Sequence, residues 1–262
     1  MRILEIVQPG TWLESPDRNW AHSTFTQIHL LTDRFFEAHA SLIDFEQARF
    51  RHRHRHDPEQ RKKDDERKAA ISIEAYAKMG LRVGHEATSL ESEVRFKREA
   101  WAAGRLPYEF EHGSQFRAAR SFVYALDSFG KHLKVLAEKT PNTPPALSNL
   151  HAAFVAFLPD LTGVRNTAQH TEDRGRRLGK GENKPLPSTG DSAGIVSPGV
   201  TDLLVLDFLQ ETRYSATMAD GNVGQIDVSY ASLEIAQKVL QAALDAFVWT
   251  GPARHMPSAP YA

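Results

Sequence analysis

The segment SQFRAARSFVYALDSFGKHLKVLAE, residues 114–138, has the most regular hydrophobic pattern in the chain. Its apolar residues recur at intervals of three and four, which is the spacing of residues on one face of an α-helix. These apolar residues are Phe116, Ala119, Val123, Leu126, Phe129, Leu133 and Leu136. We therefore predict a long core helix here and expect the neighbouring segments to pack around it.

Two further helices are expected after this segment. Residues 140–145 form a proline-rich turn, and one of its last two prolines opens the next helix, because the first helical turn tolerates proline. Pro159 then interrupts the chain, and Asp160 or Thr162 serves as the N-cap of a third helix. The pattern thus predicts three successive antiparallel helices.

The N-terminal part of the chain is also expected to be mostly helical. After a short strand at residues 2–7, residues 19–55 carry apolar residues at threes and fours. Residues 57–79 begin with Asp-Pro-Glu-Gln, an order typical of a helix start, and residues 90–103 predict a shorter helix. We interpret residues 1–105 as an N-terminal helical arm.

Short strands are expected near the C-terminus, after a long irregular loop. Residues 203–209, 212–218 and 223–228 read as strands of a small antiparallel meander, with Asp220-Gly221 as a hairpin turn. Ser229 is placed to cap a final helix. This helix stops where Gly and Pro follow one another in the sequence.

The predicted fold class is mainly α, an antiparallel helical bundle with a long N-terminal arm and a small β meander. We expect residues 106–251 to form the helical core, with the meander at about residues 203–228. Residues 252–262 are expected to be a flexible tail.

The composition is that of a soluble globular protein. The chain has 262 residues, a formal net charge of −1 and no cysteine. The charge gives no global attraction to nucleic acid or membrane, and any basic surface must be local. The absence of cysteine excludes disulfides and a cysteine nucleophile, and it suits a reducing cytoplasm. No apolar stretch reaches the ~18 residues of a membrane span, so we expect a cytoplasmic protein with no membrane partner.

The most distinctive polar motif is Val-Arg-Asn-Thr-Ala-Gln-His at residues 164–170. It places the permanent cation of Arg165 and the imidazole of His170 on one expected helix, a pairing that suits phosphate chemistry. On a continuous helix Asn166 and His170 share a face, whereas Arg165 lies on a different side. Either the long arginine side chain curls round the helix, or a second copy of the helix across a two-fold axis supplies the missing partner.

An arginine followed by a polar residue and then by a histidine, on a late helix of an antiparallel set, resembles the motif of the HEPN superfamily. The matching residues are Arg165, Asn166 and His170, and the resemblance covers roughly residues 114–174. It implies a metal-independent endoribonuclease that needs no cofactor. It also implies a homodimer in which the motifs of two protomers face one another.

The same resemblance implies a role for each motif residue. His170 would take the proton from a ribose 2′-hydroxyl or give one to the leaving oxygen, Arg165 would hold the scissile phosphate, and Asn166 would orient one of the two. Such domains are often toxins or antiviral defence nucleases, with RNA as substrate and an antitoxin or a nucleotidyltransferase as protein partner. The alternative is a non-catalytic HEPN-like helical module that binds RNA or a protein partner.

Basic residues follow the motif closely and could form an electrostatic track for single-stranded RNA. They are Arg174, Arg176, Arg177, Lys180 and Lys184. The other interpretation is a loop that is simply polar.

Histidines invite a metal interpretation at two further places. In the Arg-His repeat at residues 51–56, the flanking arginines would crowd a dication, so a solvated helix end or a basic patch touching a phosphate backbone is the other interpretation. His132 and His151 would lie at similar height in a helical hairpin, either as a buried pair or as ordinary hydrogen-bonded side chains. We predict no metal site at either place.

Overall fold

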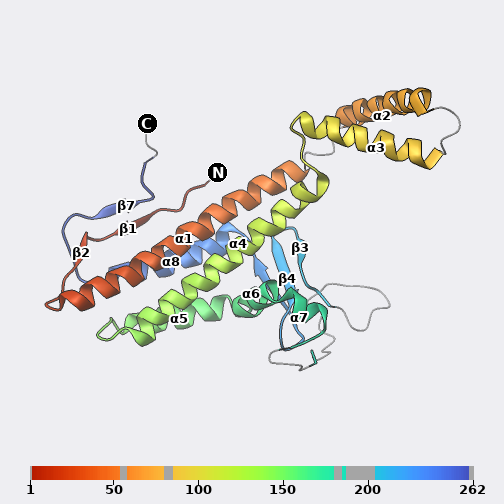
Figure 1. Ribbon diagram of the computed structural model, residues 1–262. Coiled ribbons are helices and arrows are strands. Elements are labelled where there is room, and N and C mark those ends of the chain that lie inside the picture. Colours follow the sequence, from red (N-terminus) through yellow and green to blue (C-terminus); the bar gives the residue numbers. More distant parts are fainter. Residues whose placement is uncertain (1, 54–57, 80–84, 180–184, 187–203, 260–262) are drawn as a thin grey trace. The chain divides into compact units, whose positions relative to one another are not determined.

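The computed structural model describes residues 2–53, 58–79, 85–179, 185–186 and 204–259 (Figure 1). The chain divides into two compact units. The main unit consists of Met1–Phe45 and Phe116–Ala262, and the inserted unit consists of Glu46–Gln115. This division differs from the expected boundary at residue 105, because the first 45 residues belong to the main unit.

Two long helices carry much of the core of the main unit. They are α1, Arg18–Arg53, and α4, Tyr108–Lys134, each of which contributes residues to both units. The apolar stripe predicted on α4 is confirmed, since its residues from Ala119 to Leu136 are fully buried. The helix begins six residues earlier than Ser114, and its last turn, Val135–Lys139, is π-helical.

The next two helices follow the predicted order, and a short third helix that was not predicted comes after them. They are α5, Ala146–Phe157, then α6, Leu161–Gln169, and the short α7, Thr171–Gly175. The rings of Phe129 on α4 and Phe154 on α5 lie 5.2 Å apart between centroids. Gly130 makes this approach possible, because a Cβ there would lie 2.8 Å from Cε1 of Phe154.

A small antiparallel meander forms where it was predicted, although its first strand, expected at residues 203–209, begins only at Phe208. Strands β3, Phe208–Gln210, β4, Arg213–Thr217, and β5, Val223–Asp227, pair antiparallel in the order β3-β4-β5. Gly221 adopts the positive φ of 88° that the turn between β4 and β5 requires. The final helix α8, Tyr230–Asp245, starts with Ser229 as its N-cap, as predicted, and packs against α5.

The expectation of a flexible tail after residue 251 is wrong for the part that the structure describes. Strand β7, Arg254–Met256, pairs with β1, Ile6–Gln8, and β6, Trp249–Thr250, pairs with β2, Trp12–Leu13. Sequence patterns missed this pairing because strands of two or three residues are too short to show alternation.

Helices α2, Pro58–Met79, and α3, His85–Ala102, form a hairpin within the inserted unit. Charged contacts connect the two helices: Arg67 donates two hydrogen bonds of 2.9 Å to Glu99, and Arg95 pairs with Glu74 at 2.6 Å. The hydrogen bond from Arg67 lowers the pKa of Glu99. The predicted N-cap of α2, Asp57, lies outside the described residues.

None of the helices described here combines the length and the apolar character that crossing a membrane requires.

Candidate functional site

Helix α6, which carries Arg165 and Asn166 and ends just before His170, is connected to the β meander by two hydrogen bonds. The buried hydroxyl of Thr167 donates to the carbonyl of Thr217 at 2.8 Å. The backbone N–H of Gln225 donates to Oδ2 of Asp160 at 3.0 Å. Either Asp160 or Thr162 was expected to cap α6; Asp160 occupies the N-cap position, but its side chain forms no capping hydrogen bond and accepts one from the strand instead.

Two glycines allow α6 to approach the sheet closely. Met218 fills the space between Gly163 on α6 and Gly224 on β5. A Cβ on Gly224 would lie 2.7 Å from Sδ of Met218 and 2.9 Å from Cγ2 of Val164. The sheet therefore supports the helix from which Arg165 and Asn166 project.

Arg165 is held on three sides by neighbouring residues. Its Nε lies 3.3 Å from Oδ2 of Asp127, and its Nη1 donates to Oδ1 of Asn166 at 3.1 Å. The guanidinium carbon lies 5.9 Å from the ring centroid of Tyr124, within the range of a cation–π contact. The side chain remains 24% exposed, and no described residue accepts a hydrogen bond from its Nη2.

Asp127, on α4, is the centre of this cluster, although its side chain is only 3% exposed. Its Oδ1 accepts a hydrogen bond of 2.9 Å from Thr162, and its Oδ2 also pairs with Lys131 at 2.5 Å. One carboxylate thus faces two cations, so the cluster carries one excess positive charge. Such a site favours an anion.

Sequence reasoning missed the α4 half of this cluster. Tyr124, Asp127 and Lys131 stand three and four residues apart, so they share one side of the helix beside its apolar stripe. In the sequence, the helical spacing of an aspartate from a tyrosine and a lysine, at the border of the apolar stripe, could have indicated this polar cluster. Arg120 extends the same side of α4 and pairs with Asp207 at 2.7 Å.

His170 lies at the junction between α6 and α7, not within a helix. Helix α6 ends at Gln169, and His170 has φ −119° and ψ 46°, so the expected shared helical face of Asn166 and His170 does not form. The His170 side chain is 54% exposed, with Nδ1 3.7 Å from Oε1 of Glu172. No described residue forms a hydrogen bond with its Nε2.

His170, Glu172 and Asp173 place their ligand atoms within 4.8 Å of one another. Within the described ranges this is the group of three that could hold a metal ion. His170 and Glu172 are exposed, and Asp173 also lies 3.8 Å from Arg176. The carboxylate of Asp173 therefore faces a neighbouring cation as well as the imidazole.

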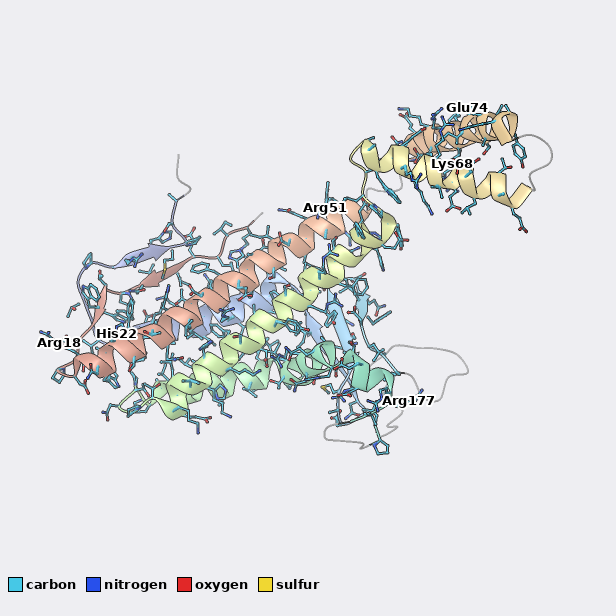
Figure 2. The ribbon with its side chains drawn as sticks, in the orientation of Figure 1. Arg18, His22, Arg51, Lys68, Glu74 and Arg177 are labelled. Carbon is cyan, nitrogen blue, oxygen red and sulfur yellow. The ribbon has the colours of Figure 1, made fainter. Side chains whose placement is uncertain are left out.

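The basic residues after the motif differ in their exposure to solvent. Arg174 is buried, and its Nη1 donates to the backbone carbonyls of Gly179, at 2.9 Å, and Leu178. It therefore fixes the backbone and is not accessible to RNA in this structure, contrary to expectation. Arg176 and Arg177 are exposed just beyond α7, where Figure 2 labels Arg177. Lys180 and Lys184 lie outside the described residues.

The other histidines of interest have separate neighbours. Nδ1 of His132 lies 3.2 Å from Oε1 of Gln27, whereas Nδ1 of His151 lies 3.9 Å from Glu138. His132 and His151 therefore each contact a different residue and do not form the suggested pair. In the inserted unit the ring of His52 lies near that of His112, and the remaining histidines of the Arg-His repeat fall outside the described residues.

Comparison of the chain with models of known families, with curated proteins and with solved structures finds no match in any of the three.

Proposed function

We propose that the chain is a HEPN-like, metal-independent endoribonuclease that uses Arg165, Asn166 and His170. The observation that carries the proposal is the environment of Arg165, whose Nε is engaged by a buried carboxylate while Nη2 has no acceptor among the described residues. A guanidinium fixed in this way is prepared to receive a phosphate oxygen. The exposed imidazole of His170 follows at the end of the same helix.

The reaction assigns separate tasks to these groups. The ribose 2′-oxygen attacks phosphorus as its proton passes to the neutral imidazole of His170 in one protomer. The bond between phosphorus and the 5′-oxygen breaks, and the leaving oxygen takes a proton from the protonated His170 of a second protomer. The products are a 2′,3′-cyclic phosphate and a 5′-hydroxyl. Arg165 stabilises the charge that gathers on the phosphate oxygens, and Asn166 keeps its Nη1 in place.

This division of labour requires a second copy of the chain, and α5 offers a surface for it. The helix precedes α6 and contains no Asp, Glu, Lys or Arg. Its exposed side chains are four alanines together with Ser148, Asn149, Val155 and Phe157, so the same surface of a second copy would meet it without opposing charges. Because the proposed site is incomplete in one protomer, we assign this surface to a homodimer.

The function is tested with a labelled single-stranded RNA, with tRNA and with a matched RNA that carries 2′-deoxyribose throughout. Cleavage of the two natural RNAs is expected to persist in EDTA and to leave cyclic phosphate ends, and the deoxy strand is expected to stay intact. His170→Ala should abolish cleavage. His22→Ala removes an exposed histidine from α1 of the same unit, labelled in Figure 2, and should cleave normally. Normal cleavage by His170→Ala would reject the mechanism.

The dimer is tested by light scattering on two matched variants. Val155→Glu places a charge on α5, where the valine is 49% exposed, and should shift the protein to monomers and reduce cleavage. Val248→Glu places the same charge at a residue that is 65% exposed between α8 and β6, and should leave the assembly unchanged. A monomeric wild-type protein that cleaves RNA would overturn the two-protomer site.

A second candidate function is a non-catalytic HEPN-like module that binds RNA or a protein partner, such as an antitoxin or a nucleotidyltransferase. The specific observation in its favour is the ion pair between Arg165 and Asp127, which alone gives the arginine a structural role in joining α6 to α4. Binding of RNA without any cleavage product, and without an effect of His170→Ala, would favour this function.

A further inference from the structure

We infer that Asp127 is a positioning residue of the proposed site, which sets the direction of the Arg165 guanidinium. This inference rests on the proposed ribonuclease function and adds a residue to it. The sequence motif does not include Asp127, which lies 38 residues before Arg165 on another helix.

The first argument is that Asp127 is itself fixed. It projects from α4 beside residues that are fully buried in the core, and its own side chain is 3% exposed. The hydrogen bond from Thr162 to Oδ1 connects the carboxylate to the first turn of α6. Both helices therefore hold the carboxylate, which can act as a rigid reference point for a longer side chain.

The second argument is that Asp127 engages one part of the guanidinium and leaves another part open. The contact to Oδ2 is made by Nε, and Asn166 accepts from Nη1, so Nη2 is the group that remains for a phosphate oxygen. An unconstrained arginine has several rotatable bonds, and most of that freedom would be lost when a phosphate binds. Asp127 restricts the guanidinium before a phosphate binds, so less conformational entropy is lost on binding.

The third argument concerns charge, and it gives the inference a distinctive signature. A carboxylate close to the phosphate site repels the substrate, so its removal by itself strengthens the binding of a polyanion. Loss of orientation has the opposite effect on the chemical step, because only a correctly placed guanidinium stabilises the transition state. Asp127→Asn should therefore separate kcat from KM.

The experiment compares Asp127→Asn with Asp33→Asn in the full-length protein, with a labelled RNA as substrate. Asparagine keeps the shape of aspartate and an acceptor for Thr162. We expect kcat to fall roughly 10- to 30-fold, with KM unchanged or lower. This factor corresponds to the free energy of the rotamer entropy that the arginine side chain regains when it is no longer held. Asp33→Asn removes an exposed charge from α1 and should change neither constant. An unchanged kcat in a folded Asp127→Asn protein overturns the inference, as does a loss that appears only as a raised KM.

A second variant covers the case in which Asp127→Asn does not fold. Thr162→Val removes only the hydrogen bond to Oδ1, and Thr162 is exposed, so the core is not disturbed. We expect a smaller fall in kcat, again without a rise in KM. A folded Thr162→Val protein with the wild-type kcat would contradict the inference.

A readout that needs no cleavage separates this inference from the proposed function. The Nε–H group of Arg165 gives an NMR signal, which we assign through Arg165→Lys. Its exchange with solvent should be slow in the wild-type protein and at least tenfold faster in Asp127→Asn. If the wild type cuts no RNA, the ribonuclease proposal fails, while slow exchange still supports the positioning of Arg165. Exchange that is equally fast in both proteins refutes the positioning role, whether or not RNA is cut.

Discussion

Replacement of Gly163 by alanine tests how closely the motif helix is fitted to the meander. The added Cβ would lie 2.9 Å from Cγ of Met218 and closer still to its Sδ. Overpacking of this kind costs roughly 1–3 kcal/mol, whereas alanine is favoured over glycine inside a helix by about 1 kcal/mol. The expected net loss in the free energy of unfolding is therefore about 0–2 kcal/mol.

The effect of Gly163→Ala on the free energy of unfolding should change sign when Met218 is replaced by alanine. In Met218→Ala the Cγ and Sδ atoms are absent, and the atom nearest to the new Cβ at Gly163 would be the Cβ of residue 218 at 3.4 Å, an ordinary contact. The helix preference then acts alone, and Gly163→Ala should stabilise this background by about 1 kcal/mol. The coupling between the two positions is thus roughly 1–3 kcal/mol.

Urea denaturation of the four proteins, followed by tryptophan fluorescence, measures this coupling. Three of the four tryptophans, Trp12, Trp20 and Trp249, belong to the main unit and report its unfolding. If Gly163→Ala changes the free energy of unfolding equally in both backgrounds, within about 0.5 kcal/mol, the close packing of α6 on the meander is refuted.

Three further predictions concern other contacts of the main unit. Thr167→Val removes the buried hydrogen bond to the Thr217 carbonyl and should lower the unfolding free energy by about 1–3 kcal/mol in urea; an unchanged midpoint would contradict it. Burial lowers the pKa of His132, so the folded state binds fewer protons than the unfolded state as the pH falls below about 6.5, and stability decreases there. His132→Gln, which cannot titrate beside Gln27, should flatten the decrease measured by thermal melts between about pH 7 and 5.5, and a parallel pH profile would show that another group causes it. Removal of residues 254–262 deletes β7 and should lower the melting temperature, whereas a freely moving tail would be removed without effect.

The sequence predicts the parts of the fold that repeat a local pattern. The stripe from Ala119 to Leu136 defines α4, the Asp-Gly turn with its flanking alternation defines β4 and β5, and Ser229 marks the start of α8. Each of these signals depends on residues close together in the chain. Local physical preferences are therefore sufficient to identify them.

The features that were missed depend on contacts between distant residues. Asp127 and Arg165 are neighbours only because α4 and α6 pack together, and the local spacing of Tyr124, Asp127 and Lys131 does not indicate that Arg165 is their partner. Arg174 resembles the exposed arginines beside it, yet it is buried because the backbone at Leu178 and Gly179 turns back onto its guanidinium. His170 was placed on a helix that ends one residue earlier. The candidate site was thus located by its motif, but its supporting residues were not.

The placement of Glu46–Gln115 as an insertion within the main unit has a consequence for synthesis on the ribosome. The hairpin of α2 and α3 uses contacts that are near in sequence, so it can form as soon as it emerges. Strand β1 cannot pair until β7 has been made, near the end of the chain. The apolar face of α1, including Phe35 and Leu42, therefore waits for partners throughout translation of the inserted unit. A ribosome that pauses near the end of residues 46–115, after α1 has left the exit tunnel, would present that face to chaperones.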